Sequence, residues 1–230
     1  MPNSEGMDDH RRADVVERFS RLQSAVVCDV YDERGWEPRA LHPDLRPVSA
    51  VDSPLAGFAA TIVGRQERFE GPDRAKLAAA DALPADSVAV WAGTDAGRYC
   101  LFGDLIAATM QGRGCRGAVV DGGIRDVHAI DTTGFPVYAR FVTPLQGLGR
   151  WRVTDVGVPV TLPAAYGEPV TVRPGDFVFG DHDGVVVIER DRIDDVLARA
   201  EAILTAEAEA RALSEEGMSA AEMLERFGHV

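Results

Sequence analysis

Apolar residues recur at intervals of three and four near both ends of the chain, a pattern typical of amphipathic helices. The first pattern predicts an N-terminal helix over about residues 9–27, with Val15 and Phe19 on one face. The last predicts a C-terminal helical extension over about residues 191–227, in which acidic side chains form a solvated face. Shorter helical patterns cover residues 73–83, 104–112 and 125–131.

Short apolar and β-branched runs between these helices predict strands. They cover residues 56–64, 87–91, 117–121, 136–142, 158–162, 169–172 and 177–189, and Asp183-Gly184 indicates a hairpin turn in the last. The first half alternates helix and strand, and the second half is richer in strands. The expected fold class is therefore α/β, with a mixed sheet or small barrel and flanking helices. Without a repeat or a long linker, residues 1–230 are expected to form a single domain.

Charge and composition restrict the partners of this chain. The formal net charge of -13 repels a phosphate backbone, and the basic residues are scattered, so no nucleic-acid partner is expected. No apolar run is long enough to span a membrane, and the start, MPNSEGMDDHRRADVV, is polar where a signal peptide is apolar. A cytoplasmic protein without a membrane partner is expected. Cys28, Cys100 and Cys115 form no CxxC pair and are expected to be buried thiols.

Glycines at 112, 114 and 117, in GRGCRG, satisfy the G-x-G-x-x-G fingerprint of dinucleotide-binding proteins. That motif binds a pyrophosphate only where it follows a strand and begins a helix. Here a helical stretch precedes the glycines and the strand GAVVD follows them. We therefore interpret the glycines as the end of a helix and a turn into a strand.

Stronger candidates for chemistry lie at the turns of the run from Gly103 to Asp126. Asp104 begins a predicted helix, and Arg125 and Asp126 follow a predicted strand and a turn at residues 122–123. Arg125 offers a planar fork of donors for a carboxylate, and Asp126 offers hard oxygen ligands for Mg2+ or Mn2+. The amides that begin the helix at Asp104 can hold an anionic group. This run predicts a site for a divalent metal and a small oxo-acid.

Structural roles explain the same residues equally well. Asp104 and Asp126 precede helical patterns and are candidates for N-caps, and Arg125 can pair with a surface carboxylate. Asp121, at a predicted strand end, is more typical of a turn. The other polar candidates are expected to be structural: His128 on a short helix, and His182 and Asp183 in a hairpin turn.

The spacing of Asp104 and Arg125-Asp126, in GDLIAATMQGRGCRGAVVDGGIRD, resembles the D-x20-R-D signature of the bacterial 4-hydroxy-4-methyl-2-oxoglutarate aldolases, relatives of the regulator of ribonuclease activity A. AVVCDVYDERG, LAGFAATIV and RPGDFVFGDHDGVVVIE are also similar to segments of that family, so the resemblance covers about residues 24–227. Leu101 departs from the family pattern, which has glycine there. Members also carry the name demethylmenaquinone methyltransferase, which the element order around GRGCRG does not support.

The resemblance implies a swivelling β/β/α fold and a trimer or dimer of trimers with sites between subunits. It implies a pyruvate aldolase of the class II type, dependent on Mg2+ or another divalent metal, with an oxaloacetate decarboxylase side activity. By position, Asp126 would hold the metal, Arg125 would bind and polarise the 2-oxo acid, and Asp104 would act on a metal-bound water. Gly103 and Leu105 would complete the substrate contacts, and Glu207 is a candidate for the acidic residue that a neighbouring chain supplies.

The resemblance leaves two further alternatives. The ribonuclease-regulator branch binds a partner protein without catalysis, although the complete Asp, Arg and Asp set favours an enzyme. An aldolase-like lyase of a specialised pathway would carry the same set and differ in its pocket walls, which the sequence does not show.

Overall fold

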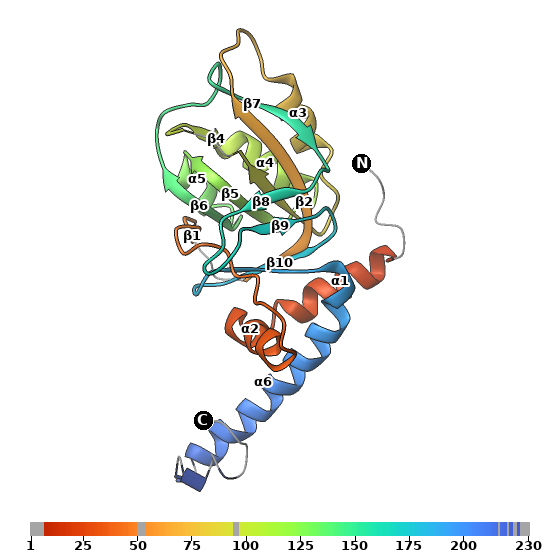
Figure 1. Cartoon of the computed structure of the whole chain (residues 1–230). Helices are drawn as coiled ribbons and strands as arrows, with labels where there is room; N and C mark the ends of the chain where they lie inside the picture. The colour runs from red at the N-terminus through yellow and green to blue at the C-terminus, as the bar shows by residue number, and fades with distance from the viewer. Residues whose placement is uncertain are drawn as a thin grey trace.

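The computed structural model describes residues 7–49, 54–93, 97–215, 217–219, 221–222 and 225. Within these ranges, nine strands form one mixed sheet that curls around an apolar interior, with helices packed on it (Figure 1). This arrangement confirms the predicted α/β class with a mixed sheet and flanking helices.

The centre of the sheet is parallel and its margins are antiparallel. Its order is β1-β6-β5-β3-β2-β10-β11, with β4 paired to β5 and β7 paired to β2. β2, β3, β5 and β6 run parallel to one another, and β4 runs parallel to β5. The strands are β1 (Arg46–Pro47), β2 (Leu55–Gln66), β3 (Ser87–Ala92), β4 (Cys100–Phe102), β5 (Gly117–Ile124), β6 (Val137–Val142), β7 (Trp151–Val156), β10 (Phe177–Gly180) and β11 (Val185–Ile188), with β8 (Val160–Leu162) and β9 (Val170–Val172) in a separate ribbon.

Two groups of helices pack against the sheet, and each encloses its own core cluster. α3 (Arg74–Asp81), α4 (Asp104–Gly112) and α5 (Val127–Asp131) enclose one core cluster, which includes Ala107, Val120 and Trp151. α1 (Asp9–Phe19), α2 (Ser24–Glu33) and α6 (Ile193–Glu215) enclose a second, in which the Phe19 ring lies 4.3 Å from that of Phe177. No described helix has the length and apolar character needed to cross a membrane.

The predicted N-terminal helix over residues 9–27 is two helices, and that prediction is wrong. α1 ends at Phe19, and α2 begins at Ser24 after an extended Gln23. The Asp181 carboxylate accepts hydrogen bonds from the Ser24 amide and hydroxyl, both at 2.7 Å. A contact from 157 residues away thus fixes the new helix start, and the apolar spacing does not reveal it.

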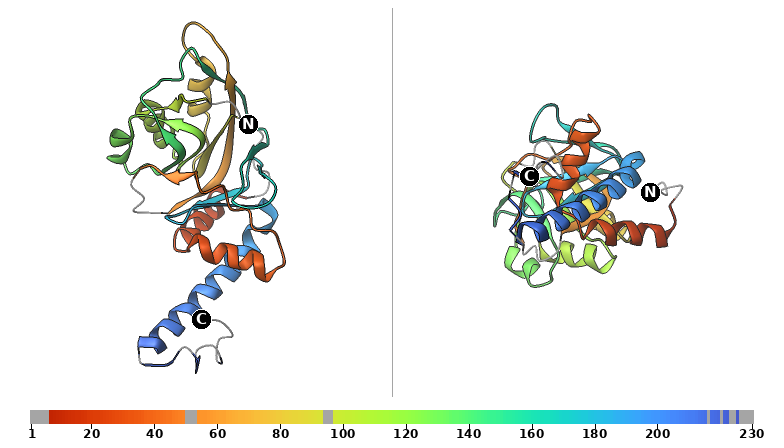
Figure 2. Two further views of the ribbon diagram at one scale, coloured as in Figure 1. Left: turned by 60° about the vertical axis from the view of Figure 1, so that its left-hand side comes forward. Right: turned by 90° about the horizontal axis from the view of Figure 1, so that it is seen from below.

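The C-terminal helix α6 leaves the body of the protein after its first turns (Figure 2). Its buried residues end at Ile203, and the helix continues to Glu215. Of residues 216–227, which were predicted to be helical, the structure describes 217–219, which are not helical, and 221–222 and 225, which are; the other six lie outside the described residues.

The region around the glycine motif has the predicted order of elements. α4 ends at Gly112, Gly114 takes a positive φ of 82°, and β5 begins at Gly117. A helix therefore precedes the glycines, which confirms that the pyrophosphate-binding arrangement is not present at them. By contrast, β5 continues to Ile124, so the turn predicted at residues 122–123 is wrong.

Candidate functional site

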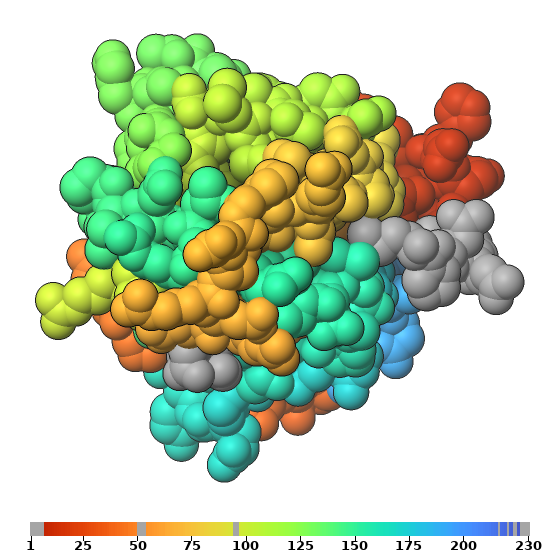
Figure 3. All heavy atoms as spheres, turned by 90° about the horizontal axis from the view of Figure 1, so that it is seen from above, coloured from red at the N-terminus to blue at the C-terminus, as the bar shows by residue number. Residues whose placement is uncertain are grey.

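The carboxyl ends of β4 and β5 bring the predicted site residues together. The strands are parallel, with Phe102 in register with Ile124, and the Arg125 amide donates to the Phe102 carbonyl at 3.3 Å. The residues that follow both strands, Gly103 and Arg125, are therefore neighbours at one edge of the sheet. Seen from above in Figure 3, the lime and green segment that holds them forms part of one exposed face.

Gly103 leaves space for the side chains of Arg125 and Asp126. A Cβ at position 103 would overlap Oδ2 of Asp126 and lie 3.2 Å from Nε of Arg125. The backbone of Gly103 is extended, with φ of -135° and ψ of -162°, which other residues also adopt. Glycine is required here by the close approach of the carboxylate rather than by backbone conformation.

Asp126 is held in a left-handed conformation, with φ of 60° and ψ of 31°. Such a conformation costs about 1–3 kcal/mol in a non-glycine residue and is concentrated at functional sites. Asp126 is the N-cap position of α5, yet its side chain makes no capping hydrogen bond. Its Oδ2 instead accepts from Nε of Arg125 at 3.1 Å, and both side chains remain more than one-third exposed. The pair is open to a ligand.

Asp104 lies in the first turn of α4, one residue after the N-cap Gly103. Its Oδ1 accepts from the amide of Leu105 at 2.8 Å. The Leu105 amide is therefore engaged within the protein, while the residue as a whole is 78% exposed. Among the described contacts, no hydrogen bond joins Asp104 to Arg125 or Asp126, so a ligand would have to bridge them.

The donor set at this edge fits a hard cation that keeps most of its waters. The described residues contain no group of three or more His, Cys, Asp or Glu side chains able to surround a metal. Asp126 alone offers a carboxylate beside Arg125, and no described donor is bonded to its Oδ1. Mg2+ commonly binds through one or two protein carboxylates and water or substrate oxygens. Asp126 fits that mode, whereas a closed protein cage does not fit.

Two residues near Arg125 were not predicted from the sequence. Oε1 of Gln146, in the loop before β7, accepts from Nη1 of Arg125 at 3.4 Å. Lys76 of α3 is largely buried, with Nζ 5.3 Å from the Trp151 ring centroid and 3.9 Å from Asp73. Burial and, to a smaller extent, the charge of Arg125 lower the pKa of Lys76, while Asp73 opposes them. Gln146 has no motif or periodic signal. The helical pattern over residues 73–83 predicts the helix of Lys76 but not its place in the fold, because tertiary packing alone sets both positions.

Leu101 and Asp121 are both buried. Leu101, the departure from the family pattern, is fully buried in β4. Asp121 lies within β5, buried and paired with Arg140 of β6, so its interpretation as a turn residue is wrong. His128 is exposed on α5.

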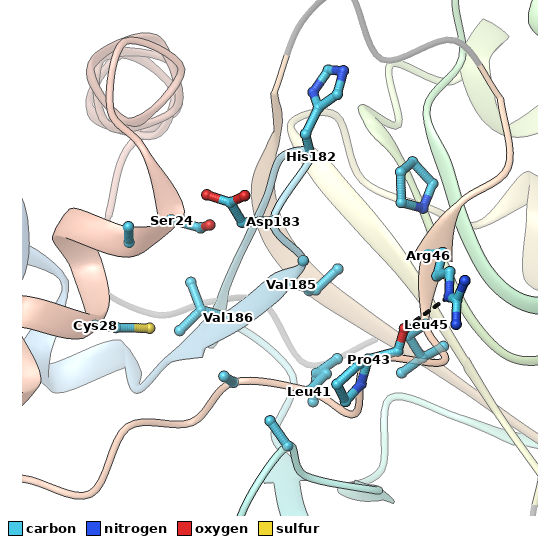
Figure 4. A pocket seen from close by; sticks show the side chains of 15 residues that line it. Ser24, Cys28, Leu41, Pro43, Leu45, Arg46, His182, Asp183, Val185 and Val186 are labelled. Carbon is cyan, nitrogen blue, oxygen red and sulfur yellow. Dashed lines mark hydrogen bonds between the residues drawn. The ribbon is translucent and has the colours of Figure 1, made fainter.

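The hairpin turn between β10 and β11 borders a separate hollow of about 590 Å3. Its lining includes His182 and Asp183, whose side chains point away from each other in Figure 4. Cys28 borders the same hollow, and burial together with nearby carboxylates raises the pKa of its thiol to about 11. The hairpin confirms the predicted chain reversal, and Cys28 is protonated at neutral pH.

Comparison with known proteins shows the family of this chain. The sequence model of the RraA-like family, described as Aldolase/RraA, matches residues 24–187. The chain belongs to the Aldolase/RraA family. The matched region of this RraA-like protein contains all of the candidate site residues except Glu207.

Several relatives resemble most of this RraA-like chain. A protein of Halalkalibacterium halodurans, provisionally named 4-hydroxy-4-methyl-2-oxoglutarate aldolase, is 28% identical, covering 94% of this chain and 96% of its own. A protein of Halorhodospira halophila with the same provisional name is 31% identical over 74% of this chain and 97% of its own. Streptomyces coelicolor RraAS2, described as an unusual member of the RNase ES inhibitor RraA family, superposes with a TM-score of 0.71 at 25% identity, covering 86% of this chain and 96% of its own.

Proposed function

We propose that the protein is a divalent-metal-dependent lyase that cleaves a 4-hydroxy-2-oxo acid, such as 4-hydroxy-4-methyl-2-oxoglutarate, to release pyruvate. The observation that carries the proposal is the geometry of Asp126. Its backbone is left-handed, its side chain makes no capping hydrogen bond and pairs with Arg125, and Gly103 leaves space for both side chains. The provisional aldolase names of two relatives support the same reaction class.

The chain's own residues supply three functions for this reaction. Arg125 binds the carboxylate of the oxo acid and places positive charge where the pyruvate enolate develops. Asp104 is the candidate to accept the proton of the 4-hydroxyl group, directly or through a water. Asp126 would hold the divalent ion, which would supply Lewis-acid polarisation of the 2-oxo group. Since oxaloacetate decarboxylation proceeds through the same enolate, we expect it as a side activity.

We further propose that the protein acts as a homo-oligomer, a trimer or dimer of trimers. Exposed apolar side chains border the site: Leu105 is 78% exposed, Val142 54% and Leu148 45%. Grouped apolar exposure of this kind marks interaction surfaces. Glu207 lies on the projecting part of α6, at the other end of the molecule from α3 and α4 (Figure 1). Glu207 could therefore join only the site of a neighbouring copy.

A second candidate is a non-catalytic regulator that binds a ribonuclease. The similarity to RraAS2, described as belonging to an RNase inhibitor family, favours it. A binding surface does not need a strained aspartate beside an arginine, so the site geometry favours the lyase. A lyase with an unusual substrate in a specialised pathway would share the site and differ in its pocket walls.

A pyruvate-release assay and a ribonuclease-inhibition assay separate these candidates. The purified protein is treated with a chelator and given 4-hydroxy-4-methyl-2-oxoglutarate or oxaloacetate, and pyruvate is measured before and after Mg2+ is restored. The lyase proposal predicts that pyruvate release stops with the chelator and returns with Mg2+. Turnover that ignores the chelator would exclude the metal mechanism, and inhibition of a ribonuclease without pyruvate release would favour the regulator.

A further inference from the structure

A second, cationic hollow of about 390 Å3 lies next to the candidate site. Its lining includes Arg68, just beyond β2, Tyr99, just before β4, and Gln146 and Arg150 in the loop before β7. No described residue that lines it is acidic, in a chain with a net charge of -13. Two guanidinium groups without a lining carboxylate form a site suited to an anion.

Gln146 joins this hollow to Arg125. Its side-chain Oε1 accepts from Nη1 of Arg125 at 3.4 Å, and its backbone carbonyl accepts from Nη1 of Arg150 at 3.0 Å. One residue thus holds a guanidinium of each site. A β-bridge to Cys100 fixes Gln146 to the sheet, so the spacing between the two arginines is set by the fold.

The backbone and an aromatic ring hold the two arginines of the hollow in place. The Glu67 amide donates to the Arg150 carbonyl at 2.9 Å, and the Phe69 amide donates to the Gly149 carbonyl at 3.4 Å, so the chain on both sides of Arg68 is bonded to the loop of Arg150. The Arg150 guanidinium lies 5.6 Å from the centroid of the Tyr99 ring, a cation–π distance.

The neighbouring acid is already neutralised. Glu67 accepts hydrogen bonds from Arg65 at 2.8 Å and from Arg152 at 3.1 Å. Among the described ion pairs, none involves Arg68 or Arg150. The paired strands β2 and β7 carry Arg65 and Arg152, which pair with Glu67, and the segments just outside them carry Arg68 and Arg150, which line the hollow.

We propose that the hollow formed by Arg68, Tyr99, Gln146 and Arg150 binds a second anionic group of the substrate, at the distal end of the fragment that leaves as the carbonyl product. This inference rests on the proposed function, because Arg125 must hold the 2-oxo acid end.

Equilibrium binding of two unreactive ligands tests the subsite without turnover. In the presence of Mg2+, calorimetry compares 2-oxoadipate with 2-oxohexanoate, which has the same chain length and lacks the second carboxylate. We expect the protein to bind 2-oxoadipate about tenfold more tightly, the value of one charge-assisted hydrogen bond. Arg150→Gln should remove most of that preference, and Arg68→Gln should reduce it. Arg65→Gln, which removes an equal charge from strand β2, should leave that preference unchanged.

Equal affinity of the unmodified protein for the two acids would overturn the subsite, as would an Arg65→Gln effect equal to that of Arg150→Gln. A protein that shows the Arg150-dependent preference but releases no pyruvate from any 4-hydroxy-2-oxo acid would refute the lyase and leave the anion subsite standing. Failure to bind either acid would overturn both proposals.

Discussion

Gly103 and Asp126 approach so closely that a single methyl group on Gly103 would overlap an oxygen of the Asp126 carboxylate. This relationship depends on the parallel pairing of β4 with β5, which places the two strand ends side by side. It accounts for glycine at a position whose backbone any residue could adopt.

We expect Gly103→Ala to reduce pyruvate release by about a hundredfold while the protein remains folded, because displacement of a catalytic group by about 1 Å costs that much. Steady-state kinetics and thermal unfolding would measure both effects. Gly112→Ala is the matched control: it lies at the other end of α4, and an added Cβ there meets nothing within 4 Å. Equal losses in both variants would contradict the role given to Gly103.

Arg125→Lys should reduce kcat by at least about a hundredfold, since a point charge does not reproduce a bidentate fork of donors. The melting temperature should change little, because this side chain is 38% exposed and its contacts are polar. Arg113→Lys provides the control, since Arg113 pairs with the exposed Asp81 at the far end of α4. A fully active Arg125→Lys enzyme would show that the substrate is held elsewhere.

Asp126→Asn should weaken Mg2+ binding at least about tenfold, because even outer-shell partners of a metal contribute that much. Asparagine tolerates the left-handed backbone, so the fold is retained. Asp86→Asn is a closely matched control: Asp86 is also left-handed, with φ of 56°, but its carboxylate pairs with Arg116. Calorimetric titration with Mg2+ measures the affinity of both variants. Unchanged affinity in Asp126→Asn would show that this residue does not bind the metal.

A part-buried hydrogen bond predicts a pH dependence of stability. The Tyr31 hydroxyl donates to Glu189 at 2.5 Å. Burial alone raises the pKa of Glu189, but the Tyr31 hydrogen bond and the charges of Arg39 and Arg192 outweigh it, and the pKa lies below its usual 4.5. The unfolded chain therefore takes up this proton first as the pH falls. The stabilisation is complete above the unfolded pKa and is lost as the pH falls through the folded value.

Tyr31→Phe should consequently cost about 1–3 kcal/mol near neutral pH and less in acid, as measured by urea unfolding. Tyr138→Phe is the control, because the Tyr138 hydroxyl donates to the backbone carbonyl of Asp181, which does not titrate. Its cost should be the same at both pH values. A Tyr31→Phe cost that does not shrink in acid would contradict the assignment.

The local elements of the site could be predicted from the sequence. The apolar spacing of residues 104–112 and the β-branched run of residues 117–121 place Asp104 at a helix start and Arg125 after a strand, as the structure shows. β4 is only three residues long and has no periodic signal, so the pairing that brings Gly103 to Asp126 could not be predicted.

Contacts between distant segments account for the remaining differences between the predicted and the observed structure. The continuation of β5 through Gly122 and Gly123 depends on its neighbour β6: a Cβ on Gly123 would overlap the Phe141 ring. Gln146 reaches Arg125 from a loop with no regular pattern, fixed by its bridge to Cys100. Such residues become visible only when strand order and register are known.

A crystal structure of the protein grown with Mn2+ and pyruvate, with the metal located by anomalous scattering, would test the proposed roles of Asp126 and Arg125. We predict a Mn2+ ion within coordination distance of an Asp126 carboxylate oxygen, with the pyruvate carboxylate in contact with Arg125. A metal bound elsewhere, or pyruvate bound without contact to Arg125, would contradict those roles.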